Sequence, residues 1–492
     1  MHALLRPVVL ILAVLLLLCA CPRAAQAQTT LTAVHGVAKD YANQTLVFRQ
    51  QVGFVTDSQL EVGRVTIGQD GSFYCPLKVT GTQLVTCEAG AYLLYFYITQ
   101  GQRYEIGFPP YQPMRDQDRL NPFQPRMEVQ LRPRGRDSLL VNDMIARYDY
   151  ALAAALDSAT ANITMQSQRI NADSLVAAVR ARFAGTQYNV PFFRDYMLYQ
   201  EGNVFYVTQT KRVQQLSDEY FKNRPILYDN PAYRDLFNTI YTKYFQFHGR
   251  TKEGQQIFRA ITEERSLHSL VRVLRQNDNL QPMALLEMVV LKGLHDEFFD
   301  ANFSREALSV VLDSLSSRTD IAEHAYIASY IREKVTRLLP GFAPYPIRIA
   351  DVKGRLLDLK QLRGKLTLIM FAMTTSYTCI EDFEMLRKFQ TRYGEHLEIV
   401  TLCADENAAS GAAFVEAQGF GWHFAMLEEQ KDLLERYDVR AFPTYYLLDE
   451  RGLLLYSPAR SPREGLESLI FQQFRQRGWQ PNLPQPPKRS FR

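Results

Sequence analysis

Cysteine and tryptophan are scarce in this chain, and histidine is not abundant. The 492 residues include six cysteines, two tryptophans and eight histidines. These side chains fall into no spacing typical of a zinc or iron site. We therefore expect neither a metal nor a cofactor.

Charge of one sign and long apolar runs are also lacking beyond the N-terminus. Lys and Arg total 56 against 52 Asp and Glu, a net charge of +4, and the basic residues are dispersed. This dispersal predicts no nucleic-acid partner. No segment after residue 27 has the length and apolar character of a transmembrane helix. The apolar fraction of 47% excludes general disorder, and the length suggests two to four domains.

The first 27 residues have the pattern of a secretory signal peptide. Arg6 precedes an apolar run over Val8–Ala20, and Ala25-Gln26-Ala27 has the small residues of a cleavage site. We expect an exported protein of the periplasm or cell envelope. Cys21 leaves open a lipoprotein, in which that residue would carry the lipid.

Residues 28–132 are predicted to form an all-β, sandwich-like domain. Short alternating runs over 46–48, 65–67, 92–98 and 104–108 are separated by turn sequences. Cys75 and Cys87 flank Gly81 at equal distance, so a hairpin centred on Gly81 would place them opposite each other. The pattern indicates either a structural disulfide between them or two independent buried thiols.

Residues 133–338 are predicted to form a helical domain. Leu140, Met144 and Tyr148 follow Asp137-Ser138 with the spacing of an amphipathic helix. Similar stripes recur up to Leu339, with many Tyr and Phe residues that we interpret as core aromatics.

Residues 340–478 alternate strand and helix patterns, which predicts an α/β domain with a mixed sheet. Residues 479–492 are Pro-rich and basic, and we expect a disordered tail. Within the α/β domain a strand ends at the turn Ser376-Tyr-Thr-Cys379. Thr378 and Glu381 have the spacing of a capping box for the helix that follows.

Several motifs in this C-terminal region are those of one family. The region resembles the envelope thioredoxin-like thiol–disulfide oxidoreductases, the TlpA/ResA-like group of the AhpC/TSA-type superfamily. The matching segments, in chain order, are Gly341-Phe-Ala-Pro344, Asp351-Val-Lys-Gly354, Leu359-Lys-Gln-Leu-Arg-Gly364-Lys365, Val439-Arg-Ala-Phe-Pro443-Thr444 and Leu448-Asp-Glu-Arg-Gly452.

The resemblance implies a role for each position of the turn and of a second loop. The attacking cysteine of the family falls on Ser376 and the resolving cysteine on Cys379. The family's cis-proline falls on Pro443, whose loop (Phe442, Pro443 and Thr444) would present backbone to an extended substrate segment.

The turn departs from the family in its chemistry. A serine hydroxyl cannot replace the thiolate that attacks a disulfide. Glu381, Asp382 and Glu384 stand where the family has a base, and they should disfavour a neighbouring thiolate. Met370 also replaces a buried strand acid of the family.

Three functions remain open from the sequence. The first is a binding or scaffolding module that has lost dithiol exchange and holds a polypeptide or protein partner at the Pro443 loop. The second is a single-cysteine enzyme, peroxidase-like or forming mixed disulfides, in which Cys379 reacts alone or pairs with Cys403. The third is an assembly protein whose function lies in the helical domain.

Overall fold

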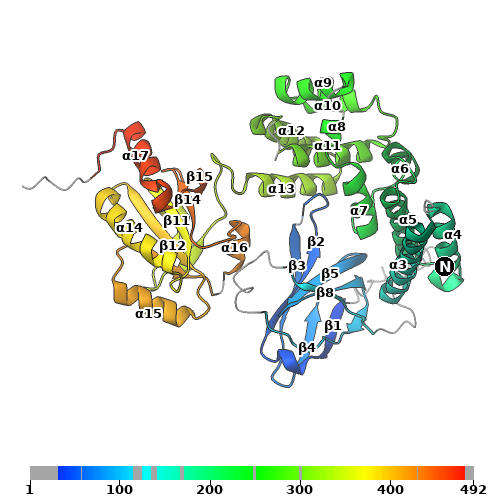
Figure 1. Ribbon diagram of the computed structural model, residues 1–492, viewed down its shortest axis with the longest axis horizontal. Helices are drawn as coiled ribbons and strands as arrows, with labels where there is room; N and C mark the ends of the chain where they lie inside the picture. Colours follow the sequence, from blue (N-terminus) through cyan, green and yellow to red (C-terminus); the bar gives the residue numbers. More distant parts are fainter. Residues whose placement is uncertain are drawn as a thin grey trace, which may run out of the picture.

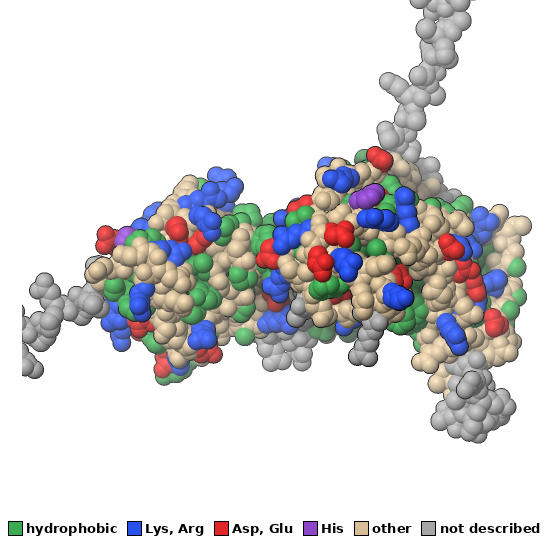
Figure 2. All heavy atoms as spheres, turned by 90° about the horizontal axis from the view of Figure 1, so that it is seen from above, with side chains coloured by type: hydrophobic (Ala, Val, Ile, Leu, Met, Phe, Trp, Pro, Cys, Tyr) green, Lys and Arg blue, Asp and Glu red, His purple; other side chains and the backbone are tan. Residues whose placement is uncertain are grey.

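The computed structural model describes residues 31–481 except 57, 115–124, 135–140, 167–170, 248–250, 299–301 and 429. The predicted signal peptide with Cys21, and residues 482–492 of the predicted tail, lie outside the described residues. Figure 1 shows strands in the first part of the chain, helices in the middle part and a mixed α/β arrangement at the end. Figure 2 shows basic and acidic side chains interspersed on one face of the molecule.

The N-terminal strands form two sheets with a core between them. One sheet has the order β4-β1-β7, and the other has the order β3-β2-β5-β6-β8. Alternate side chains are buried in most of these strands, as expected for strands with one face on a core. The strands are β1 Ala33–Val37, β2 Thr45–Gln51, β3 Gln59–Thr66, β4 Ser72–Pro76, β5 Thr82–Ala89, β6 Tyr92–Thr99, β7 Arg103–Glu105 and β8 Met127–Gln130.

The predicted Cys75–Cys87 hairpin is wrong. Cys75 lies opposite Val34 of β1, whereas Cys87 lies opposite Phe48 of β2 and Leu94 of β6. The symmetric spacing about Gly81 predicted a hairpin that does not form, because β4 and β5 belong to different sheets. Both cysteines are free and buried in the core, and burial raises the pKa of Cys75 to about 11 and that of Cys87 to about 12.

Every element of secondary structure described between residues 141 and 336 is a helix. Its helices pack around one large core rich in aromatic rings. The helices are α3 Val141–Gln166, α4 Ala172–Ala181, α5 Pro191–Val207, α6 Val213–Tyr220, α7 Pro231–Ile240, α8 Tyr244–Phe247, α9 Lys252–Phe258, α10 Leu267–Leu274, α11 Met283–Glu297, α12 Arg305–Arg318 and α13 Ala322–Thr336.

The strands and the helices share part of this core. Phe54, at the end of the β2–β3 hairpin, inserts its ring beside Phe237 of α7, and Figure 1 shows the hairpin tip next to that helix. Asn142 of α3 binds both the backbone N–H and the carbonyl of Tyr97 in β6, each at 2.7 Å. The helical core is therefore completed by side chains from the strands.

A carboxylate near this junction predicts a pH-dependent stability. Both carboxylate oxygens of Asp149 in α3 lie within hydrogen-bonding distance of the Tyr196 hydroxyl, at 2.9 and 3.1 Å, and burial raises the pKa of Asp149 from 3.8 to about 6. A carboxyl group whose pKa is raised by folding favours the folded state at low pH. That contribution is lost as the pH rises from about 4 to about 6.

Asp149→Asn should therefore stabilise the protein above pH 7 by about 2 kcal/mol, because the amide carries no buried charge. Urea unfolding at pH 4.5 and 7.5 measures the effect. Asp157→Asn, at an exposed site on the same helix, is the control. Equal behaviour of the two variants would contradict the prediction.

The C-terminal region has the strand order β13-β12-β11-β14-β15. Strands β11, β12 and β13 are parallel, and β14 and β15 are antiparallel, which confirms the predicted mixed sheet. Strand β11 is central and buried along its whole length, as its apolar run, interrupted by Thr367 alone, predicts. The elements are β9 Arg348–Ala350, β10 Leu356–Asp358, β11 Leu366–Ala372, α14 Tyr377–Tyr393, β12 Leu397–Cys403, α15 Ala408–Gln418, β13 His423–Met426, α16 Asp432–Arg436, β14 Thr444–Leu448, β15 Leu454–Ala459 and α17 Leu466–Arg477.

Helices cover both faces of this sheet. Helices α14 and α17 pack against one face, and α16 with the β9–β10 hairpin packs against the other. Trp479 was predicted to lie in the disordered tail, but in the structure its side chain is packed. Its ring stacks on His396 with centroids 4.4 Å apart, so the ordered chain continues past α17.

Candidate functional site

The turn between β11 and α14 contains both residues of the Ser-x-x-Cys sequence. Ser376 is the N-cap of α14, with an extended backbone (φ −84°, ψ 121°), and its side chain makes no capping bond. Its hydroxyl lies near the Cys379 thiol and acts to lower the pKa of that thiol. The predicted capping box is wrong, because the helix begins at Tyr377 and places Thr378 inside its first turn.

Cys379 is fully buried beneath this turn. Burial raises the pKa of its thiol, and the charges of Asp382 and Asp405 raise it further. Hydrogen bonds from the Met373 backbone and from Ser376 act in the opposite direction without cancelling the effect. The thiol is therefore mostly protonated at neutral pH and out of reach of solvent.

An arginine that is distant in sequence pairs with the acidic residues that follow the first turn of α14. Arg463, in the short 3₁₀ turn Pro462–Glu464, forms ion pairs with Glu381 and Asp382, the latter at 3.1 Å. Asp382 is fully buried and also accepts a hydrogen bond of 2.7 Å from the Tyr445 hydroxyl.

The three predicted acids therefore do not act alike. Glu384 points toward Arg387, at 3.2 Å, and Glu381 toward Arg463 and Tyr377. Asp382 is the one of these carboxylates whose charge acts on Cys379. Reasoning from sequence missed Arg463 and Tyr445, because nothing in their local sequence indicates that they meet this turn.

A buried carboxylate at the end of β12 fixes the other side of the turn. Asp405 accepts hydrogen bonds from the backbone N–H of Thr374, at 2.9 Å, and from its hydroxyl, at 2.7 Å. The bonds join the ends of β11 and β12, where ligand sites of open α/β sheets gather. The sequence analysis also missed this residue.

Cys403 lies beside the turn but is not bonded to Cys379. It ends β12 opposite Ala372, and both cysteines are free and buried in the same core. Complete burial raises the pKa of Cys403 well above its usual value, with Asp405 and Cys379 adding to the effect.

The Pro443 loop lies next to the end of β11. The peptide bond between Phe442 and Pro443 is cis, as the resemblance implies, and Thr444 lies opposite Phe371 in the β11–β14 ladder. Phe442, Pro443 and Thr444 are each partly exposed. Tyr377, the second residue of the Ser-x-x-Cys sequence, is 74% exposed.

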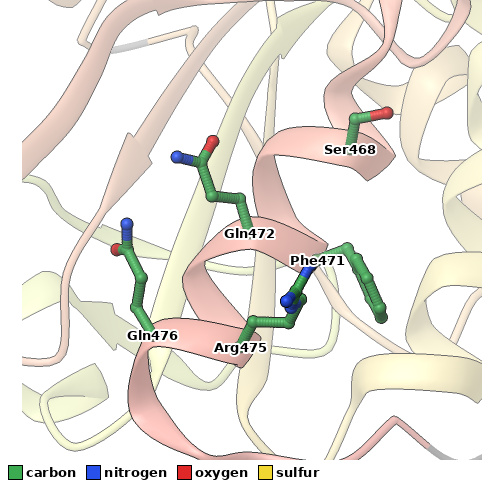
Figure 3. A pocket seen from close by; sticks show the side chains of 5 residues that line it. All are labelled: Ser468, Phe471, Gln472, Arg475 and Gln476. Carbon is green, nitrogen blue, oxygen red and sulfur yellow. The ribbon is translucent and has the colours of Figure 1, made fainter.

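A hollow of about 490 Å³ lies over α17, away from these residues. Ser468, Phe471, Gln472, Arg475 and Gln476 line it, all from the solvent-facing side of the helix (Figure 3). It contains none of the predicted site residues and does not extend the site.

Nowhere in the described ranges do three or more His, Cys, Asp or Glu side chains meet as a group that could hold a metal ion.

Among the residues that the structure describes, no helix combines the length and apolar character needed to cross a membrane.

The C-terminal region of the chain is similar to known proteins. The family model described as Redoxin matches residues 336–468. The thiol-disulfide oxidoreductase ResA of Bacillus anthracis is 30% identical over 105 residues, which are 21% of this chain and 60% of the relative. The thioredoxin-like protein YneN of Bacillus subtilis (strain 168) is 26% identical over 109 residues, 22% of this chain and 63% of the relative.

Solved structures align with the same part of the chain. The thioredoxin domain of a Bacteroides vulgatus thiol-disulfide oxidoreductase is 20% identical, with a TM-score of 0.25 over 27% of this chain and 98% of that chain. The exposed lipoprotein thioredoxin of Streptococcus pneumoniae strain TIGR4 is 17% identical, with a TM-score of 0.23 over 26% and 98%.

The match spans about 60% of the length of the first curated relatives. The Redoxin match over residues 336–468 includes the central strand, the Ser-x-x-Cys turn and the Pro443 loop, and the strand order of this region is that of a thioredoxin-like sheet. Residues 336–468 are therefore a Redoxin domain with a thioredoxin-like fold, homologous to the ResA and YneN proteins.

Proposed function

We propose that this protein is an exported binding module that has lost dithiol exchange and holds an extended polypeptide segment at the Pro443 loop. The observation that carries the proposal is Ser376 at the helix N-cap in front of a buried Cys379. The match of residues 336–468 to the Redoxin family model supports descent from a protein with redox chemistry.

Dithiol exchange needs an accessible thiolate that attacks one sulfur of a disulfide and displaces the other. Ser376 occupies the attacking position and has no sulfur. Cys379 is shielded from solvent, and burial raises its pKa, so little thiolate forms at neutral pH. Neither residue meets the requirement.

The surface for binding lies around the turn. Tyr377 is exposed on one side, and the Phe442–Thr444 loop is partly exposed where β14 begins beside β11. An extended polypeptide can pair its backbone with such a loop while an aromatic ring contacts its side chains. The apolar signal-like N-terminus favours partners in the periplasm or cell envelope.

The single-cysteine enzyme is the weaker hypothesis. It requires Cys379 to reach a peroxide or a disulfide as thiolate, and both its burial and its raised pKa oppose this. Arg440, a cation three residues before Pro443, forms an exposed ion pair with Asp438.

Thiol titration tests the loss of reactivity. The four described cysteines are all buried and free, so native protein should react with a small aromatic disulfide reagent roughly 100-fold more slowly than unfolded protein. Tyr377→Cys, which adds a thiol at an exposed neighbour, should react at once and serves as the positive control. Rapid modification of Cys379 in the native protein would sink the proposal.

Binding of an unfolded chain tests the surface itself. Fluorescein-labelled insulin B chain with carboxymethylated cysteines is a suitable probe, because it has no thiol to exchange. Tyr377→Ala should weaken its binding by roughly 5-fold, the effect of one exposed aromatic contact. Tyr326→Ala, which removes a 64% exposed tyrosine from α13, is the matched control and should change nothing. Equal affinity of both variants would place the binding elsewhere.

A further inference from the structure

A second hollow lies among the N-terminal strands, far along the chain from the Ser-x-x-Cys turn. Its volume is about 760 Å³, within the usual range of ligand sites. Both sheets contribute to its walls. We call this hollow the β8 groove. Its lining includes Gly36, Val37, Phe73, Glu105, Ile106, Gly107, Phe108, Val129, Gln130, Leu131, Arg132 and Arg134.

The floor of the β8 groove is apolar. Phe73, Ile106 and Leu131 line it and belong to the core between the two sheets, with exposed fractions of 7, 1 and 4%. Phe108 and Val129 pack against the same core and are partly buried. Apolar side chains of a ligand would gain free energy by covering this floor.

One wall of the groove is an unpaired strand edge. Strand β8 is the last strand of its sheet and pairs with β6 alone. The N–H groups of Met127 and Leu131 bond carbonyls on the β6 side. Since successive residues of a strand face opposite neighbours, the backbone groups of Gln130 and Arg132 face away from β6. They pair with no backbone group among the described residues.

The opposite wall of the groove, formed by β1 and β7, also lacks part of its strand pairing. Strand β7 pairs with β1 only over Ala33–His35, whereas β1 continues to Val37, which is 61% exposed. Residues 105 and 134 then join the two sides by a pair of backbone hydrogen bonds of 2.9 and 2.8 Å. The groove is thus bounded by backbone at one end and open along β8.

The charge of the groove is positive at its rim. Leu131 and Pro133 are buried, whereas Arg132 and Arg134 between and after them are exposed. Within the described part of the chain neither arginine forms an ion pair, and Glu105 is the acid that lines the groove. A strand lying here would meet apolar groups on its inner face and arginines on its outer face.

We infer that the β8 groove binds an extended polypeptide segment with alternating apolar and acidic residues, which joins the sheet as an additional strand beside β8. Exposed strand edges are templates for such pairing. The alternation follows from the groove, because the inner side chains of the added strand face Phe73 and Leu131, and the outer ones face Arg132 and Arg134. This site is separate from the Pro443 loop.

Fluorescence polarisation on protein spanning residues 28–492 tests the inference, with a fluorescein-labelled acetyl-(Val-Glu)₄-amide probe. A (Val-Lys)₄ probe should bind at least roughly 10-fold more weakly, because it repels the arginines. The double variant Arg132→Glu/Arg134→Glu should reverse this preference. Arg475→Glu, an exposed charge reversal on α17, should leave both affinities unchanged.

Two further measurements separate strand addition from simple charge attraction. A Cβ at Gly107, which lines the groove, would meet no described atom within 4 Å, so a larger side chain can begin there, and Gly107→Trp should abolish binding. N-methylation of alternate residues on one edge of the probe should remove binding, while methylation on the other edge should not. No binding of the (Val-Glu)₄ probe, binding unaffected by Gly107→Trp, or tolerance of both methylation patterns would each overturn the inference.

Discussion

Ser376→Cys is expected to form a disulfide with Cys379 and to gain disulfide-exchange activity. The Ser376 side chain lies near enough to the Cys379 thiol to act on its pKa, so a sulfur at this position starts close to its partner. Residue 376 is partly exposed at the N-terminus of α14, a position that lowers the pKa of a thiol. Insulin reduction should rise at least roughly 10-fold above that of the unmodified protein.

Mass spectrometry after mild oxidation gives an independent readout of this variant, since disulfide formation removes two hydrogen atoms, whose electrons pass to the oxidant. Ser376→Ala is the control and should remain inactive, because it has no sulfur to attack. A variant that forms the disulfide and still reduces no insulin would contradict the expectation that a sulfur at position 376 restores exchange.

Phe54→Ala is expected to destabilise the protein by about 3–5 kcal/mol. The ring is 3% exposed and contacts Phe237, Tyr233 and Tyr228, with centroids 5.3 to 6.1 Å apart. Its removal leaves a cavity in the core that the strands and helices share. The loss should lower the urea midpoint of both parts together.

Phe471→Ala is the matched control for this experiment, because that ring is 44% exposed on α17. It should change the free energy of unfolding by less than about 0.5 kcal/mol. A similarly small effect of Phe54→Ala would mean that the hairpin tip contributes little to the helical core.

The fold of the C-terminal region could be predicted because its signals are local. Strand β11 is apolar except for Thr367, and the sequence alternates strand and helix patterns around it. The position of Pro443 beside the turn followed from the resemblance. Periodicity and turn residues carry this kind of information without knowledge of distant contacts.

Features that depend on distant contacts were predicted less well. The spacing of Cys75 and Cys87 about Gly81 suggested one hairpin, but the strands pair across two sheets. The acids after Cys379 suggested a uniformly negative turn, but Arg463 neutralises part of it from 81 residues away. The insertion of Phe54 into the helical core has no local signal either.

Reduction of insulin by the unmodified protein tests the central claim most directly. With dithiothreitol as the electron source, the account predicts no turnover above the dithiothreitol background, because Ser376 cannot attack and Cys379 is buried. Turnover comparable to that of an ordinary thioredoxin, lost in Cys379→Ala, would contradict it.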